Sequence, residues 1–186
     1  MKRIFDLFLS LNLIIILFPL IVVIFFVVKT TSYGPAFHFS KRIGLGNKTF
    51  MMPKFRTMKL DVPNIATHLL KDVDNYLTPI GRFMRKTSLD ELPQIFSIII
   101  GDMSFVGPRP ALFNQHDLIS LRNKKDIHTL MPGITGWAQI NGRDNITIKQ
   151  KVELDLEYKK KKSFYFDVYI LWLTLIKVIQ KDDVKH

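Results

Sequence analysis

The sequence contains no cysteine among its 186 residues. This absence excludes disulfide bonds and thiolate metal sites, and it suits a reducing compartment without requiring one. The histidines lack the spacing of paired metal ligands, so no role is assigned to them. They are His38, His68, His116, His128 and His186.

Glycine-rich nucleotide motifs are also missing. A GLG triplet stands at 44–46, but the remaining glycine of a dinucleotide-binding fingerprint does not follow, and no GK[S/T] sequence occurs. A Rossmann fold or a P-loop is therefore not predicted. No internal repeat, low-complexity tract or long linker divides the chain, and its length suits one domain with a real core.

Acidic residues are scarce. The chain has 16 Asp and Glu against 27 Lys and Arg, a formal net charge of +11. Such a balance favours polyanions, anionic lipid or phosphorylated substrates as partners, and charge alone does not choose among them. One hypothesis is a membrane-tethered basic module for nucleic acid or anionic lipid. The cations are not interleaved with a base-stacking platform, so no nucleic-acid partner is predicted.

Charge is almost absent from the N-terminal segment. Residues 13–28 are all apolar, and Asp6 is the only charged residue in 4–28. As a straight helix, residues 4–28 would extend about 37 Å, which is enough to cross a bilayer. A spanning helix is therefore one interpretation.

Two features favour a re-entrant hairpin instead. Pro19 lies inside the run, where it removes a helical hydrogen bond and kinks or breaks the helix. Basic residues flank both ends, and the positive-inside tendency then places both ends on the cytoplasmic face. We predict a helix-break-helix over 1–30 with Pro19 as hinge, and a cytoplasmic or interfacial domain over 31–186. A cleaved signal peptide is not expected, because no small-x-small site follows the run.

The C-terminal segment 163–181 is predicted to be an interfacial amphipathic helix. It follows the run Lys159–Lys162, for which a solvated surface and a headgroup-binding patch are both open interpretations. The apolar N-terminal segment favours the membrane. A narrow polar stripe along the predicted helix consists of Asp167, Thr174, Lys177 and Lys181.

The middle of the chain is predicted to be α+β and mostly helical. Residues 36–42 and 48–58 are predicted as the strands of a small β-hairpin around the turn-rich GLGN at 44–47. Pro53 cannot donate to a ladder, so the second strand lies at an edge or carries a bulge.

Two short helices and two loops are predicted after this hairpin. The helices are 78–86 and 88–100, and the glycine- and proline-rich clusters are 101–110 and 132–144. The clusters cannot be regular elements throughout. They are predicted as loops of defined shape, where binding residues commonly lie.

The stretch TSLDELPQ places Asp90 beside Glu91. Ser88 and Glu91 fit the N-cap and N3 positions of a capping box, and the helix dipole favours acids in a first turn. This structural interpretation suffices for the stretch alone. The same placement suits catalysis, because helix amides would keep Asp90 ionised as a nucleophile or Mg²⁺ ligand.

Cations elsewhere in the chain complement these acids. Arg109 stands between two prolines in GPRP, and Arg143 ends a glycine-rich loop in NGR. Either arginine could grip a phosphate bidentately, and Lys54 and Arg56 of KFRTM are further candidates. Each alone is compatible with an ordinary surface cation. Together, these cations and the two acids are the functional groups that Mg²⁺-assisted phosphoryl transfer requires.

The motifs together resemble one known family. In order they are a basic N-terminus with a proline-broken apolar segment, KFRTM, TSLDELPQ, GDMSFVGPRP, PGITGWAQINGR and an aromatic C-terminal helix. This combination resembles the small monotopic phosphoglycosyl transferases, the bacterial sugar transferases that begin glycan assembly. The resemblance covers nearly the whole chain.

The resemblance implies a reaction and a location. A phosphosugar would pass from a UDP-sugar to a polyprenyl phosphate, undecaprenyl phosphate in most bacteria, with release of UMP. This is the first membrane step of capsule, O-antigen, exopolysaccharide or glycoprotein assembly. The enzyme would lie in inner-membrane lipid at the cytoplasmic face, as a monotopic protein.

The resemblance also implies site roles. Asp90 would be the nucleophile that forms a covalent phosphosugar intermediate and would help to hold Mg²⁺, with Glu91 as its partner in a dyad. Arg109 and Arg143 would bind the donor phosphates. The two cations of KFRTM would lie near the active site.

Some features depart from the family or stay open. Phe18 precedes Pro19 where many relatives have serine, and phenylalanine has no hydroxyl to satisfy a carbonyl freed by the kink. No residue selects the sugar, although the short chain and the likeness to capsule-type and glycoprotein-type initiators favour an N-acetylated or 6-deoxy amino sugar over glucose or galactose. A noncatalytic scaffold on the same fold is an alternative, and self-association stays open.

Overall fold

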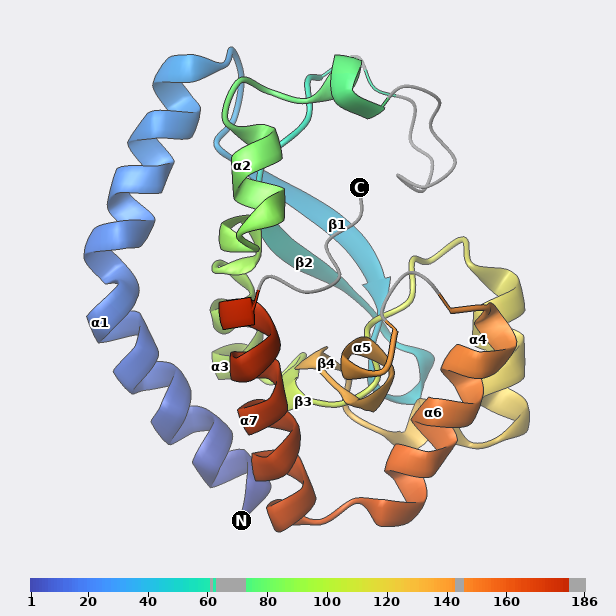
Figure 1. Cartoon of the computed structure of the whole chain (residues 1–186). Helices are drawn as coiled ribbons and strands as arrows, with labels where there is room; N and C mark the ends of the chain where they lie inside the picture. The colour runs from blue at the N-terminus through green and yellow to red at the C-terminus, as the bar shows by residue number, and fades with distance from the viewer. Residues whose placement is uncertain (61, 63–72, 143–145, 181–186) are drawn as a thin grey trace.

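A computed structural model describes residues 1–60, 62, 73–142 and 146–180 (Figure 1). These residues are mostly helical and include two small sheets, which confirms the predicted α+β class. The α-helices are α1 Lys2–Thr31, α2 Gly81–Lys86, α3 Gln94–Ile100, α4 His116–Lys124, α5 Trp137–Ile140, α6 Ile148–Lys161 and α7 Phe164–Gln180. The strands are β1 Phe37–Ile43, β2 Thr49–Phe55, β3 Ser104–Val106 and β4 Gly133–Thr135.

Helix α1 is long and apolar, and it is continuous through Pro19. The predicted non-helical break is therefore wrong. Figure 1 shows instead a bowed helix whose two ends turn toward the rest of the molecule. A proline inside a helix causes such bending, because one backbone hydrogen bond is lost. By length and composition α1 is the one helix among the described residues that could cross a membrane.

Both ends of α1 are bound to the same folded body. At the start, Lys2 donates to Asp167 on α7 at 2.5 Å and to the carbonyl of Val106 at 3.0 Å. At the end, Arg56 donates to the carbonyl of Ser32, the residue after the helix, at 2.8 Å. The second half of α1 also packs against Phe55 in a small core.

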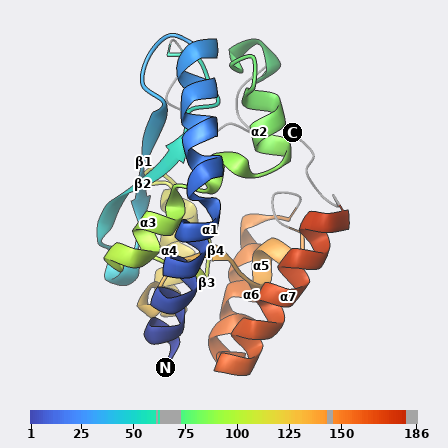
Figure 2. The same cartoon turned by 90° about the vertical axis from the view of Figure 1, so that its left-hand side faces the viewer.

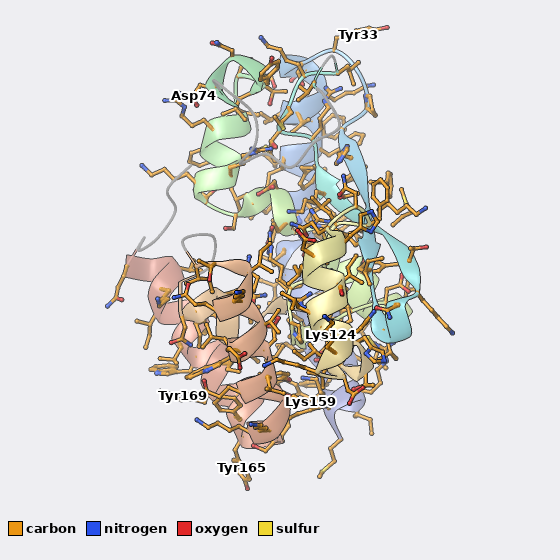
Figure 3. All side chains as sticks on the ribbon, turned by 90° about the vertical axis from the view of Figure 1, so that its right-hand side faces the viewer. Tyr33, Asp74, Lys124, Lys159, Tyr165 and Tyr169 are labelled. Carbon is orange, nitrogen blue, oxygen red and sulfur yellow. The ribbon has the colours of Figure 1, made fainter. Side chains whose placement is uncertain are left out.

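Helices α1 and α7 each bury polar residues against the body and expose many apolar residues. On α1, Asp6 and Ser10 are buried, while Ile15 and Ile16 are exposed. On α7, Asp167 is buried and the hydroxyl of Thr174 lies 2.7 Å from that of Thr135, so these two residues of the predicted polar stripe face the body, and Lys181 lies outside the described residues. Figure 2 shows α1 across the front of the molecule with α7 beside its N-terminal half, and in Figure 3 Tyr165 and Tyr169 point outward from α7. The exposed large apolar residues of α7 are Phe164, Tyr165, Val168, Tyr169, Trp172, Leu175 and Val178.

The predicted hairpin is confirmed. Strands β1 and β2 pair antiparallel, with Phe37 opposite Phe55 at one end and Ile43 opposite Thr49 at the other. The sheet has two strands, so Pro53 lies on an edge strand as predicted.

The two glycine- and proline-rich clusters pair with each other through short parallel strands. Ser104 lies opposite Gly133, and Val106 lies opposite Thr135. A Cβ added to Gly133 would meet the backbone nitrogen of Gly107 at 2.1 Å, so only glycine permits this close approach. The clusters were predicted as loops, and most of their length is irregular. Their pairing brings the GPRP loop next to the PGITG loop.

Candidate active site

Asp90 and Glu91 lie on a single 3₁₀ turn, Leu89–Glu91, between α2 and α3. The predicted capping box at Ser88 is wrong. Ser88 has a left-handed backbone, with φ of 56°, and its side chain makes no capping hydrogen bond. The α-helix begins only at Gln94, so neither acid occupies the first turn of an α-helix.

Glu91 is the anion that gathers two of the predicted cations. Its Oε1 accepts hydrogen bonds from Lys54 Nζ at 2.6 Å and from Arg109 Nη2 at 2.8 Å. The structure therefore brings together β2, the turn Leu89–Glu91 and the GPRP loop. Burial by itself raises the pKa of Glu91, but the charges and hydrogen bonds of Arg109 and Lys54 outweigh it and hold this pKa well below its ordinary value.

Asp90 has a different environment. Its side chain is buried, with 8% of the residue exposed, and no described side chain donates a hydrogen bond to its carboxylate. Burial raises the pKa of Asp90, opposed mainly by the charge of Lys54, with smaller contributions from Arg85 and Arg109. Nearby cations, and not the amides of a helix, favour its ionised form.

The carboxylate of Asp90 is suited to a magnesium ion. Mg²⁺ is commonly bound by one or two carboxylates, with water and substrate phosphates completing its shell. Among the described residues no cluster of three or more His, Asp or Glu could hold a metal by itself. Asp90 therefore fits as a protein ligand, with the substrate supplying phosphate oxygens, whereas Glu91 Oε1 is already occupied by cations.

Arg56, a further predicted cation, is bonded to another part of the molecule. The hydrogen bonds of Arg56 go to the carbonyl and hydroxyl oxygens of Ser32, at 2.8 and 2.7 Å, so it fastens the end of α1. Arg143 lies outside the described residues.

Three basic residues near the site were missed from the sequence. Arg85 on α2 donates to Thr57 at 2.9 Å and is close enough to Asp90 to lower its pKa. Arg42 on β1 is close to Arg109 and Glu91, and burial lowers its pKa to about 10. His38 lies directly opposite Lys54 in the hairpin register. The alternation of 38, 40 and 42 on one face of the predicted strand was a signal for two of these residues.

This arrangement defines a class of protein. The buried carboxylate of Asp90 lies beside basic side chains from β2, α2 and the GPRP loop, and Arg42 of β1 lies close to the neighbouring Glu91. Such a site can hold an anionic phosphate against a nucleophile, and positioning with charge neutralisation carries most of the catalysis in phosphoryl transfer. The fold adds an apolar helix next to this site, because α3 directly follows the turn and packs against α1.

The chain belongs to the bacterial sugar transferase family, whose sequence profile matches residues 1–181. It is 40% identical, over its whole length and 91% of the relative's, to a protein named uncharacterized sugar transferase EpsL of Bacillus subtilis strain 168.

Two relatives carry names that describe a reaction. A UDP-glucose:undecaprenyl-phosphate glucose-1-phosphate transferase of Xanthomonas campestris pv. campestris is 40% identical over 88% of this chain and 35% of its own length. An undecaprenyl-phosphate galactose phosphotransferase of Salmonella typhimurium strain LT2 is 35% identical over 98% of this chain and 41% of its own length. The chain thus spans less than half of either relative.

Proposed function

We propose that the protein transfers a phosphosugar from a UDP-sugar to a polyprenyl phosphate, such as undecaprenyl phosphate, and releases UMP. The observation that carries this proposal is the buried carboxylate of Asp90 next to a carboxylate, Glu91, that gathers Lys54 and Arg109. The printed names of the relatives support the classes of donor and acceptor.

The proposed reaction has two steps. An oxygen of Asp90 attacks the phosphorus that carries the sugar, the bond from this phosphorus to the bridging oxygen breaks, and UMP leaves with that oxygen. The phosphosugar is then bound to Asp90 as an acyl phosphate. A phosphate oxygen of the polyprenyl acceptor attacks the same phosphorus, and the carboxylate of Asp90 leaves. The product is a polyprenyl diphosphate sugar.

The neighbouring residues bind the donor and position the groups that contact it. Lys54 and Arg109 neutralise the donor diphosphate, and Glu91 holds both cations in place before the donor arrives, which makes Glu91 a positioning residue. Arg143 is a further candidate for the donor phosphates. Mg²⁺, when bound at Asp90, supplies further charge neutralisation on the transferring phosphate.

The membrane part of the proposal is a monotopic enzyme with a re-entrant α1, bound at the cytoplasmic face of the inner membrane. It is supported by the two ends of α1, since Lys2 and Ser32 both contact the same folded body. A spanning helix would instead place its two ends on opposite sides of a hydrocarbon core about 30 Å thick, so that a body on one side could not contact both ends. The outward apolar residues of α1 and α7 supply the lipid-facing surface. The acceptor phosphate lies at the headgroup level, where α3 would hold the catalytic turn.

Two classes of sugar are candidates for the donor. The named relatives act on glucose and galactose, whereas the sequence favours an amino sugar, and the relatives are much longer than this chain. A panel of UDP-sugars assayed with undecaprenyl phosphate decides between these classes.

The test is UMP release by purified protein in detergent with Mg²⁺ and undecaprenyl phosphate. Asp90→Asn keeps the size of the side chain and removes its nucleophilic charge, so the rate should fall at least about 10³-fold, as losses of catalytic nucleophiles commonly do. Asp74→Asn is the matched control, because Asp74 is exposed and pairs only with the exposed Arg82 among the described residues. Wild-type turnover by Asp90→Asn would sink the proposal. If the wild-type protein binds lipid but releases no UMP, the alternative of a noncatalytic scaffold on the same fold would be favoured.

A further inference from the structure

Arg122 on α4 and Asp155 on α6 form a buried ion pair behind the GPRP loop. The two residues are 8% and 1% exposed. Arg122 donates from Nε and Nη2 to the same oxygen of Asp155, Oδ2, at 3.0 and 2.6 Å. Two bonds from one guanidinium edge fix the plane of the group, because the guanidinium is rigid.

The remaining nitrogen of this guanidinium reaches the candidate active site. Arg122 Nη1 donates to the backbone carbonyl of Arg109 at 2.9 Å. Arg109 in turn donates from Nη2 to Glu91 Oε1 at 2.8 Å. A continuous chain of polar contacts therefore runs from Asp155 inside the body to the cation cluster.

The GPRP loop depends on such anchors. Prolines flank Arg109 on both sides, and proline has no backbone N–H to donate. The loop is instead held through its carbonyls. The proline carbonyl before Arg109 accepts from the backbone nitrogen of Gly133 at 3.0 Å, and the one after it accepts from Arg42 Nη1 at 3.2 Å. Three consecutive carbonyls are thus held from three different elements, and the middle one belongs to Arg109.

We propose that Arg122 and Asp155 are positioning residues for Arg109, and that they set the direction from which its guanidinium meets a diphosphate. A buried ion pair contributes little net stability by itself, because desolvation offsets the attraction between the charges. Aiming Arg109 gives this pair a function that two apolar residues could not provide. The inference rests on the proposed role of Arg109 as a ligand of the donor phosphates.

A matched control pair joins the residue after α4 to α6. Lys125, which follows α4, and Glu153 on α6 form an ion pair at 2.5 Å, with side chains that are 34% and 63% exposed. Figure 3 shows the face of the molecule on which α4 lies in front, marked by Lys124. Lys125→Gln therefore breaks a contact between the same elements without touching the carbonyl of Arg109.

The experiment measures the affinity for UDP by calorimetry and the melting temperature of the full chain in detergent. Arg122→Lys keeps the charge, but a single nitrogen cannot make all three hydrogen bonds. We expect this variant to bind UDP roughly 10-fold more weakly, within the range of up to about 100-fold that small misplacements cost. Lys125→Gln should bind UDP like the wild type. In an Arg109→Gln background, Arg122→Lys should cause no further loss, because both changes remove the same contact with UDP.

A second variant separates positioning from folding. Arg122→Met combined with Asp155→Leu replaces the pair by apolar residues, which commonly preserves stability. We expect it to melt near the wild-type temperature and still to bind UDP weakly. Wild-type UDP affinity in this double variant or in Arg122→Lys would overturn the inference. So would wild-type UDP affinity in Arg109→Gln alone. The inference would also fail if the losses of UDP affinity caused by Arg122→Lys and Arg109→Gln were fully additive. UMP release is measured separately, so a protein that binds UDP through Arg109 without turnover would refute the proposed function alone.

Discussion

At the scale of single residues, adjacent carboxylates occupy opposite electrostatic environments. Glu91 accepts hydrogen bonds from two cations, which lower its pKa, whereas burial raises the pKa of Asp90. At pH values above the ordinary pKa of a glutamate, ionised Glu91 therefore stabilises the folded state. This stabilisation is lost as the pH falls through the lower pKa that Glu91 has in the folded state. Ionised Asp90 opposes folding at neutral pH, because the folded state favours its protonated form.

This difference predicts opposite effects of two isosteric substitutions. At pH 7, Asp90→Asn should raise the melting temperature by a few degrees, since about 1 kcal/mol corresponds to about 2–4 °C in a chain of this size. Glu91→Gln should lower it, because removing one partner of a buried ion pair costs up to about 3–5 kcal/mol. Thermal unfolding of both variants in one detergent provides the comparison. Shifts of the same sign would contradict the assigned environments.

A second prediction concerns pH. Arg85 lowers the pKa of Asp90 but donates its hydrogen bond to Thr57 and not to Glu91. Arg85→Gln should therefore raise the pKa of Asp90 and move the acidic limb of the kcat profile to higher pH. Arg82→Gln on the same helix is the control, because Arg82 pairs with the exposed Asp74. An unchanged limb in Arg85→Gln would exclude Asp90 as the group that titrates in this limb.

The sequence predicted the centre of this site better than its surroundings. The grouping of Asp90, Glu91, Lys54 and Arg109 was expected from their motifs. The capping box was a local inference, and it failed because the carboxylate of Glu91 is used by cations that lie far away in the chain. Arg85 and the Arg122 pair were missed, because only packing between elements brings them to the site.

At the scale of elements, α1 and α7 are joined by a buried polar network. Lys2 bonds to Asp167, and the hydroxyl of Tyr158 donates to the same carboxylate at 2.7 Å. Burial, together with the hydrogen bond and charge of Asp167, raises the pKa of Tyr158. The network fixes the first turn of the apolar helix against the C-terminal helix.

Exchange of the two charges tests this network. Lys2→Asp and Asp167→Lys should each lower the melting temperature, because each leaves like charges together at a partly buried site. The double exchange should recover part of this loss, as interacting positions are not additive. Lys29→Asp is the control at the opposite end of the same helix. Complete additivity would show that the pair does not couple the helices.

The helices and strands that have a periodic local sequence pattern were predicted, and those without one were not. The hairpin was expected from two alternating segments around a glycine turn, and the last helix from its periodicity. Strands β3 and β4 are three residues each and contain or adjoin glycines, so their parallel pairing leaves no periodic signal. The inward orientation of Asp167 also could not be predicted, since a polar stripe alone does not show which side of a helix faces lipid.

At the scale of the whole molecule, the proposed monotopic topology places both ends of α1 on one side of the membrane. The natural chain has no cysteine, so single cysteines report topology without background. We expect a cysteine inserted after Met1 and the variant Tyr33→Cys to be labelled by an impermeant maleimide from the cytoplasmic side only. Figure 3 shows Tyr33 at the edge of the molecule, where 94% of it is exposed. Labelling of the two positions from opposite sides would establish a spanning helix.

The central claim is that Asp90 carries the phosphosugar during turnover. The most direct measurement is the intact mass of the purified protein after incubation with its UDP-sugar and Mg²⁺ in the absence of acceptor. We expect wild-type protein to gain the mass of one phosphosugar, to lose it when undecaprenyl phosphate is added, and Asp90→Asn to gain nothing. The same mass gain on Asp90→Asn, or sustained wild-type turnover in which no adduct forms, would contradict the account.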